Sequence, residues 1–482
     1  MALKIDKMSF ICELLLLAEL FEKVPTPKKR LLVMNTFNER WRAFSEYLTE
    51  MIDGRVLGLF RILFSIVLFW TVVSYLQMDL VYNMYVFPSV NFKYDGLTWL
   101  EPISAGWMNG ILYAMLVLSA LMVVGVWFRW ATWLYTLGFL YFFLLDTSLY
   151  NNHLYLYALL AVMLTFTDAH KYLSLSKDKP GSVGIPRWQQ WVFQLQFVIV
   201  YFYAGVVKLS GDWLFRQEPI RVIIGELPSD SIYNVFFKSE AGIYLFTYGG
   251  LILDLAAPLL LWYKPIRKWT VYIFIFFHFS NSRIFDDIGT FPFAMIASML
   301  LFYEWSELSW LRRLFGETSQ GGKKSPRQVI PVVKELPRLW LVYFFLQLLL
   351  PLRGFFLPND LDWTLIGQRF SWRVKLDARV MTELAFEAHL VTGQVMPVDV
   401  TSFINTHQIR NLAYDPRSIR ELAIGVQKAV MDQQGVPCKV KARIKVSRNG
   451  RPAQEFVDPT VDLATARYSP WEKLTWVRDF QK

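Results

Sequence analysis

Residues 196–213 read QFVIVYFYAGVVKLSGDW, an apolar run that ends in Lys208, Asp212 and Trp213. A membrane-spanning helix needs about 20 apolar residues, and the run supplies them when it is extended backwards to give 191–209. Charged and aromatic residues at its end are typical of the place where such a helix reaches the membrane surface. The stretch therefore predicts a transmembrane helix with a lysine at one end.

Eight further apolar runs occur along the chain, at 56–76, 108–127, 130–147, 153–167, 242–263, 269–280, 291–304 and 337–352. Several are short, and a short segment is tolerated in a membrane when it is tilted or shielded by neighbouring helices. We expect a polytopic α-helical membrane domain of about nine spans. It occupies residues 51–352, after a partly amphipathic N-terminal segment at 1–50 that includes the apolar run 10–20.

The composition agrees with a membrane protein, because 54% of the 482 residues are hydrophobic and 17% are aromatic. Soluble domains have about 45–50% apolar residues. The net charge of +10 is explained by basic loops, and no RNA- or DNA-binding motif occurs, so we expect no nucleic-acid partner. The two cysteines, Cys12 and Cys438, do not have zinc-site spacing, and we expect no metal.

Basic residues in alternate loops give the membrane domain a direction. The basic segments contain Lys28, Lys29, Arg30, Arg40 and Arg42; Arg129; Lys171, Lys177, Lys179 and Arg187; Lys264, Arg267 and Lys268; and Arg312, Arg313, Lys323, Lys324 and Arg327. Lysine and arginine accumulate in cytoplasmic loops, so the N-terminus is expected to be cytoplasmic. An odd number of spans then puts the C-terminal region on the extracytoplasmic side.

The composition changes after the last apolar run, and residues 353–482 are expected to form a separate domain. Apolar residues at 440, 442, 444 and 446 alternate with basic ones, Asn449-Gly450 follows, and a second strand is expected at 454–457. This pattern is a strand, a hairpin turn and a strand. Residues 417–433 have a helical pattern. We expect a β-rich extracytoplasmic domain, specifically a β-sandwich.

Three polar clusters stand at the outer ends of predicted spans, where polar groups are costly. They are Asn151-Asn152-His153, Lys208 with Trp213, and His278 with Asn281. Each has an ordinary structural interpretation, since a lysine at a helix end snorkels to the headgroups and asparagine caps helices. Their common depth favours one polar pocket with apolar walls. Burial disfavours the charged form of a lysine, and an uncharged lysine can act as a base.

Longer motifs extend these clusters. They are Leu145-Asp146, 151–157, 164–169, 200–209 with Asp212-Trp213, Leu253-Asp254-Leu255 and 278–282 in the helices, and Phe370-Ser371-Trp372, 458–463, Ser469-Pro470 and Thr475-Trp476 in the tail. In these residues the chain resembles the vitamin K-dependent γ-glutamyl carboxylase family over about residues 50–480. The tail resembles the shorter bacterial form of that family's outer domain.

The resemblance implies a membrane carboxylase, a carbon–carbon lyase that also forms vitamin K epoxide. Its cofactor would be reduced vitamin K of the menaquinone or phylloquinone type, with O2 and CO2 as co-substrates and no metal. By position Lys208 would be the base and His153 a second catalytic residue. The residues expected to bind the quinone are Asn151, Asn152, His153, Tyr201, Trp213, His278 and Asn281.

The resemblance also implies the partners and the location. Membrane lipid surrounds the helices, a glutamate-containing peptide or protein arrives on the outer face, and the membrane is the bacterial inner membrane. Two departures bear on the peptide reaction, because Gly354 and Gln368 stand where the family usually has histidine. Arg353 or Arg369 would then hold the peptide carboxylate.

Two other functions stay open on the sequence alone. One is a quinol oxygenase that forms the epoxide without carboxylating protein. The other is a transporter or scaffold without enzymatic activity, which would more often have half-repeats and broken helices at the middle of the membrane. The peptide recognition sequence and the oligomeric state are not determined by these patterns.

Overall fold

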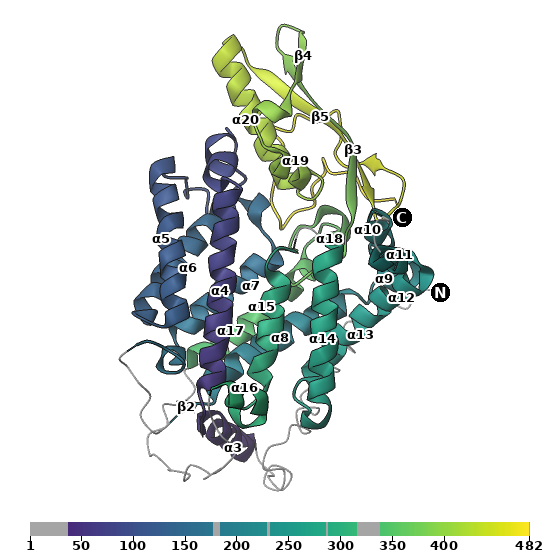
Figure 1. Ribbon diagram of the computed structural model, residues 1–482. Helices are drawn as coiled ribbons and strands as arrows, with labels where there is room; N and C mark the ends of the chain where they lie inside the picture. The colour runs from purple at the N-terminus through teal and green to yellow at the C-terminus, as the bar shows by residue number, and fades with distance from the viewer. Residues whose placement is uncertain (1–36, 177–183, 229–231, 286–287, 316–337, 482) are drawn as a thin grey trace.

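The computed structural model describes residues 37–176, 184–228, 232–285, 288–315 and 338–481. The apolar run at 10–20 that is expected to be amphipathic, and Cys12 within it, lie outside the described residues. Helices fill the first three-quarters of the chain, and the main sheet follows them (Figure 1).

The longer helices are α3 (Phe37–Thr49), α4 (Arg55–Gln77), α5 (Ala105–Val124), α6 (Phe128–Leu145), α7 (Asn152–Thr165), α8 (Trp188–Val207), α13 (Gly250–Leu260), α14 (Lys264–Ile284), α17 (Arg338–Leu349) and α20 (Pro416–Gln434). The shorter helices are α9 (Gly211–Arg216), α10 (Ile220–Gly225), α11 (Ile232–Lys238), α12 (Glu240–Tyr244), α15 (Phe291–Ser298), α16 (Ser309–Leu314), α18 (Leu361–Thr364) and α19 (Thr406–Leu412). The strands are β1 (Met51–Ile52), β2 (Ile185–Pro186), β3 (Arg379–Leu390), β4 (Val395–Val398), β5 (Cys438–Arg448) and β6 (Gln454–Glu455).

Each of the nine apolar runs coincides with a helix or with consecutive helical segments. Within the described ranges, five helical stretches are long and apolar enough to cross a membrane: Arg55–Gln77, Ala105–Val124, Trp188–Val207, Glu240–Leu260 and Leu339–Phe356. Two more, α7 and Phe291–Phe302, are apolar but shorter. The chain is therefore an integral membrane protein of the helical type, and the count of nine spans stays a prediction.

Burial explains why short helices are tolerated. Helix α7 has only 14 residues, and most of its side chains are buried by neighbouring helices. In the central helix α8, 67% of the most apolar stretch is buried, whereas in α5 only 28% of the corresponding stretch is buried. Helix α5 therefore lies at the periphery, where its apolar side chains face lipid, and α8 lies in the middle, where side chains can define a site.

The C-terminal region contains one antiparallel sheet with the strand order β4-β3-β5-β6. On β5, residues at alternate positions from Cys438 to Arg448 are buried, as the sequence pattern predicts. The turn Asn449-Gly450 has positive φ at both positions, which is the geometry of a tight hairpin. Helix α20 packs its apolar face on β5, and both contribute to one hydrophobic core.

A second sheet facing this one is not found among the described residues, so the predicted β-sandwich is not confirmed. The sheet and α20 form two layers, with a helix where the sandwich would have a sheet. The sheet lies at the end of the helices opposite to α3 and α16 (Figure 1). Polar contacts join helices of the C-terminal region to loops between the membrane helices, among them Gln408 of α19 to Asp146 at 3.0 Å and Arg417 of α20 to Asp95 at 2.5 Å.

Candidate active site

Helix α8 ends beside a buried lysine. Lys208 follows Val207 as the C-terminal capping residue, and the chain turns into α9, whose first turn is capped by the Ser210 hydroxyl. Because the lysine side chain runs back along the helix, its Nζ donates to the carbonyl of Ala204 at 3.2 Å. The Lys208 side chain is only 8% exposed, so it does not reach the headgroup region as a snorkelling lysine would.

The partner of this lysine is Asp254 on α13, whose Oδ2 lies 2.5 Å from Nζ. The Asp254 side chain is 7% exposed. Helices α8 and α13 approach closely at Gly205, where an added Cβ would lie 3.0 Å from the backbone nitrogen of Leu255 and nearer still to its side chain. Glycine at this position therefore permits the helix contact that brings the carboxylate to the amine.

Aromatic side chains and a histidine complete the walls. The Tyr201 hydroxyl lies 2.9 Å from Nε2 of His278, which joins α8 to α14. The other ring nitrogen of His278, Nδ1, is buried and has no hydrogen-bond partner among the described residues. The Trp213 ring lies 5.2 Å from Nζ of Lys208, and its own nitrogen donates to the carbonyl of Thr247. The result is an apolar enclosure with few polar groups, which come from α8, α9, α13 and α14.

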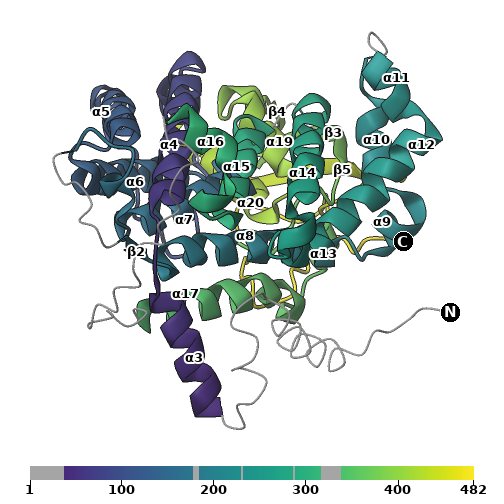
Figure 2. The same cartoon turned by 60° about the horizontal axis from the view of Figure 1, so that its bottom comes forward.

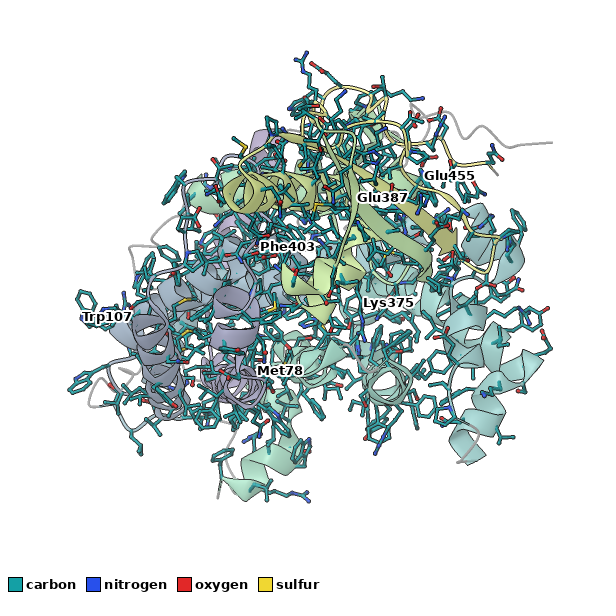
Figure 3. All side chains as sticks on the ribbon, turned by 90° about the horizontal axis from the view of Figure 1, so that it is seen from above. Met78, Trp107, Lys375, Glu387, Phe403 and Glu455 are labelled. Atoms are coloured by element: carbon teal, nitrogen blue, oxygen red, sulfur yellow. The ribbon has the colours of Figure 1, made fainter. Side chains whose placement is uncertain are left out.

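These residues line one cavity whose empty space is about 640 Å³, including its opening. Its lining includes Lys208, Asp254, Tyr201, Trp213, His278 and Asn281, together with phenylalanines of α14, α15 and neighbouring segments. Val374 and Lys375, from the segment before the sheet, line it from the other side. Seen from above, Lys375 lies between the sheet and the helices (Figure 3). The C-terminal region therefore covers this pocket through Val374 and Lys375, which we call the roof.

Two of the three predicted polar clusters meet in this cavity, and the third does not line it. Asn151 caps α7 by accepting from the backbone of His153 at 3.5 Å. Asn152 donates to the carbonyl of Arg373 at 2.8 Å, next to the roof residues. The His153 ring lies 5.9 Å from the ring of Phe291, which lines the cavity. Asn152 therefore contacts the segment next to the roof, and His153 packs against a residue of the cavity wall, but neither lines the cavity itself.

The two predicted carboxylate-binding arginines also lie outside the cavity lining. Arg353 donates to the carbonyls of Leu350 and Arg369, and the guanidinium of Arg369 lies 2.7 Å from the Asp415 carboxylate. Both therefore already have polar partners at the junction of the two regions. Their predicted role in holding a peptide carboxylate is not tested by this arrangement.

The family resemblance predicts histidine at Gly354 and Gln368. Gly354 lies in the short helical segment Leu350–Phe356, and Gln368 follows a turn after α18 that packs against it. An added Cβ at Gly354 would lie 2.9 Å from the Leu361 side chain and 3.4 Å from the Gly367 carbonyl. Gly367 has φ +91, which favours glycine. Any side chain at residue 354 would have to displace these neighbours.

Asp254 is the residue that the sequence interpretation missed as part of the site. Its signal was present, because an acid between two leucines in a predicted span is a functional candidate. The pairing itself was not predictable, since Lys208 and Asp254 are 46 residues apart and meet only through the packing of α8 on α13. Lys375, which also lines the cavity, was not among the predicted site residues.

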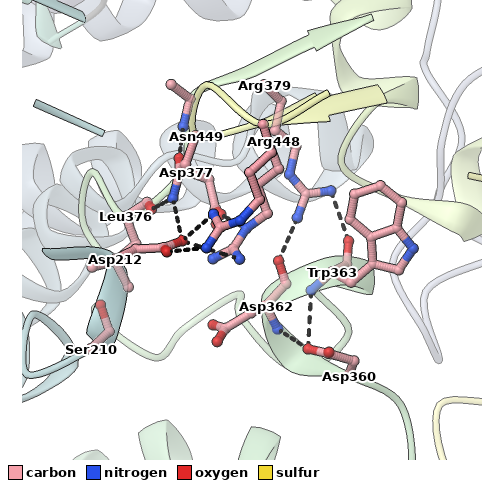
Figure 4. A network of polar contacts seen from close by, with 12 residues as sticks. Ser210, Asp212, Asp360, Asp362, Trp363, Leu376, Asp377, Arg379, Arg448 and Asn449 are labelled. Atoms are coloured by element: carbon pink, nitrogen blue, oxygen red, sulfur yellow. Dashed lines mark hydrogen bonds and ion pairs between the residues drawn. The ribbon is translucent and has the colours of Figure 1, made fainter. Parts of the chain in front are cut away.

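A group of polar contacts, which we call the latch, joins the β5–β6 hairpin of the C-terminal region to α9 in the pocket wall. Asp212, next to the wall residue Trp213, accepts hydrogen bonds from Asn449 at 3.0 Å and from Arg451 at 2.9 Å. Arg448 lies 3.4 Å away and also pairs with Asp377 (Figure 4). The β5–β6 hairpin is thus tied to α9, four residues after Lys208.

Burial alone would raise the pKa of Asp212, but hydrogen bonds from Arg451 and Asn449 and the charge of Arg448 outweigh it and hold the pKa below its usual value. A carboxylate with a lowered folded-state pKa stabilises the fold above its unfolded value of about 4, and that stability is lost as the pH falls through the folded-state pKa. The latch is therefore fully formed at neutral pH.

We expect Asp212→Asn to loosen the hairpin, because two arginines lose a buried counter-charge. The expected cost is about 2 kcal/mol at pH 7, and the difference from wild type should shrink as the pH falls below about 4. The measurement is the thermal midpoint, followed by tryptophan fluorescence at several pH values. Asp479→Asn, at a surface pair in which Asp479 is 79% exposed, is the matched control. Equal stability of Asp212→Asn and wild type at pH 7 contradicts the latch.

Comparison with known families covers both regions of the chain. Residues 49–309 match the family model of the HTTM domain. Residues 334–482 match the model described as vitamin K-dependent gamma-carboxylase, lumenal domain. No solved structure matches the chain. The first match contains the Lys208–Asp254 pair, and the second contains the roof and the hairpin.

Proposed function

The chain belongs to the vitamin K-dependent gamma-glutamyl carboxylase family, and on that premise we propose that its pocket binds reduced vitamin K and activates it through Lys208. The observation that supports the proposal most is the buried Lys208–Asp254 pair in the wall of an aromatic cavity. Family membership implies a carboxylase-like membrane enzyme with an extracytoplasmic C-terminal region. The reaction, the boundary at residue 353 and the bacterial inner membrane are part of the proposal.

The residues present suit a reduced quinone. Its flat apolar ring needs aromatic walls, and its hydroxyl groups need a small number of polar partners. Tyr201, Trp213 and Phe291 supply rings, and the unpartnered Nδ1 of His278 is a polar atom available to one hydroxyl oxygen. Lys208 and Asp254 are the groups that would accept a proton from one of these hydroxyl groups. When bound, the reduced vitamin supplies with O2 the strong base that removes the γ-proton of glutamate, and it leaves as the epoxide.

In the mechanism that we propose, the Lys208–Asp254 pair is the proton acceptor. An ion pair holds one mobile proton between the amine and the carboxylate, and it can take a second from a bound hydroxyl. The pair then carries a net positive charge opposite the oxygen that lost its proton, in surroundings that exclude water and strengthen the attraction. His278, fixed by the Tyr201 hydroxyl, would orient the ring.

The roof has the second role in this proposal. Asn152 holds the carbonyl of Arg373, so Val374 and Lys375 are kept over the cavity. A glutamate side chain from a peptide on the outer side would enter beneath them, where a carbanion is protected from water until CO2 arrives. We propose that Asn151, Asn152 and His153 act through the roof and through Phe291, and that Arg353 or Arg369 meets the peptide at the rim.

A second candidate function is quinol oxygenation without protein carboxylation. The close packing at Gly354 favours it, because this glycine leaves no side chain at a position where the family resemblance predicts a histidine. The oxygenation half-reaction needs only the base and a dry pocket. The carboxylation half-reaction also needs a docked peptide.

The test is purified protein in lipid nanodiscs, with reduced vitamin K, labelled bicarbonate and glutamate-containing peptides. Epoxide and fixed label are measured separately, with Lys208→Ala as the inactive control. We expect epoxide from the wild type and none above background from the control. Label fixed in step with epoxide supports the carboxylase, and epoxide without label supports the oxygenase. Bound quinol with neither product refutes both.

A further inference from the structure

A second and larger hollow lies on the other face of α15, away from the proposed active site. Helix α15 stands between α4 and α14 (Figure 2). Its Phe291 and Met295 line the active-site cavity, whereas its Phe293 and Ile296 line this groove. The empty space of the groove is about 2040 Å³, including its opening.

The groove has the length of one membrane leaflet. Along α14 its lining runs from Lys264 to Ile275, which is about 16 Å at 1.5 Å per residue. Half of a hydrocarbon core is about 15 Å. The upper end is lined by Trp70 and Phe293, whose rings stack with their centroids 6.3 Å apart. The lower end carries Trp310, an exposed ring of the kind found at membrane interfaces.

The charges sit only at the lower end, on the side opposite the sheet (Figure 1). Lys264, Arg267 and Lys268 line it, together with the carboxylate of Glu307. Glu307 pairs with Arg267 at 2.9 Å and with Lys264 at 3.1 Å, and Lys264 also lies 3.5 Å from Glu304 outside the groove. No carboxylate of the described residues lies within ion-pairing distance of Lys268, whose Nζ is 5.9 Å from the Tyr272 ring.

We propose that this groove is a binding site for one anionic phospholipid of the cytoplasmic leaflet. Its acyl chains lie along Leu63, Val271 and Ile275, and its phosphate meets Lys268 beside Lys264 and Arg267. Three cations face two carboxylates, Glu307 in the lining and Glu304 beside it, so this end of the groove keeps an excess of positive charge. Basic pockets between helices on the cytoplasmic side bind anionic headgroups. The site stands on geometry that is independent of the quinone reaction.

The test compares phosphatidylglycerol with phosphatidylcholine of the same acyl chains. Detergent-solubilised protein is titrated with each lipid, and bound lipid is counted by native mass spectrometry. We expect wild type to retain phosphatidylglycerol several-fold more tightly. Lys268→Gln should reduce that preference about five-fold, as expected for one cation at an anionic surface. Arg313→Gln, an equal charge change on α16 outside the groove lining, should leave it unchanged.

A second variant tests the apolar part. Ile275 is 38% exposed, and Ile275→Trp should fill the groove and lower retention of both lipids without altering the headgroup end. Equal retention of the two lipids by wild type, an unchanged preference in Lys268→Gln, or full retention by Ile275→Trp would overturn the proposal.

Discussion

Replacing Lys208 with methionine is expected to remove epoxide formation. The substitution keeps the length of the side chain but leaves no atom in the cavity that pairs with Asp254. General base catalysis typically contributes about 10²–10⁴-fold, so turnover should fall by about that factor. The readout is epoxide formed from reduced vitamin K, alongside direct measurement of bound reduced vitamin K, which reports whether the quinol still binds.

The variant leaves a buried carboxylate without its counter-charge, and that alone destabilises a protein by about 3–5 kcal/mol. The double variant Lys208→Met, Asp254→Leu removes both charges and separates folding from chemistry. It should regain stability and stay inactive. Lys428→Met, at an exposed position on α20, is the matched control. Epoxide formation at the wild-type rate in a folded Lys208→Met protein would refute the assignment of the base.

The sequence was most informative where one local pattern decides the structure. The nine apolar runs became helical segments because their length and composition leave few other conformations in a membrane. The hairpin at Asn449-Gly450 was predictable because two residues with positive φ are required there. The apolar faces of 417–433 and of β5 were both visible in the sequence. Neither pattern indicates that the helix packs on the strand. A β-sandwich was therefore predicted, whereas in the structure helix α20 covers the sheet.

The site was less predictable because its parts meet only through tertiary contacts. Lysine and histidine at the outer ends of spans were recognised from their cost in a membrane. Equal depth in the membrane does not establish a common pocket, however. Asn152 was predicted to lie at the same depth as Lys208, yet its side-chain amide donates to the carbonyl of Arg373, 221 residues later, and does not line the cavity. The sequence shows which residues have suitable chemistry. Only the structure shows which of their side chains line the cavity.

Replacing Asp254 with asparagine is the sharpest test of the paired base. The amide still accepts a hydrogen bond from Lys208, and the volume is nearly unchanged, so the cavity should keep its shape. The variant loses the carboxylate that shares the mobile proton and holds Nζ toward the cavity. If the two residues act as a unit, epoxide turnover should fall about 10²-fold with little change in quinol KM, and Asp254→Glu should recover part of it.

A lysine that acts alone gives a different result. Removing the carboxylate would then leave the amine free to accept the hydroxyl proton by itself. Turnover of Asp254→Asn would in that case equal or exceed that of the wild type. The comparison with Asp212→Asn adds a control, because that carboxylate is close in sequence to Lys208 but lies in the latch. If epoxide is lost in Asp254→Asn but not in Asp212→Asn, the Lys208–Asp254 pair is the proton acceptor. The loss would then not be a general effect of removing a negative charge near the outer face.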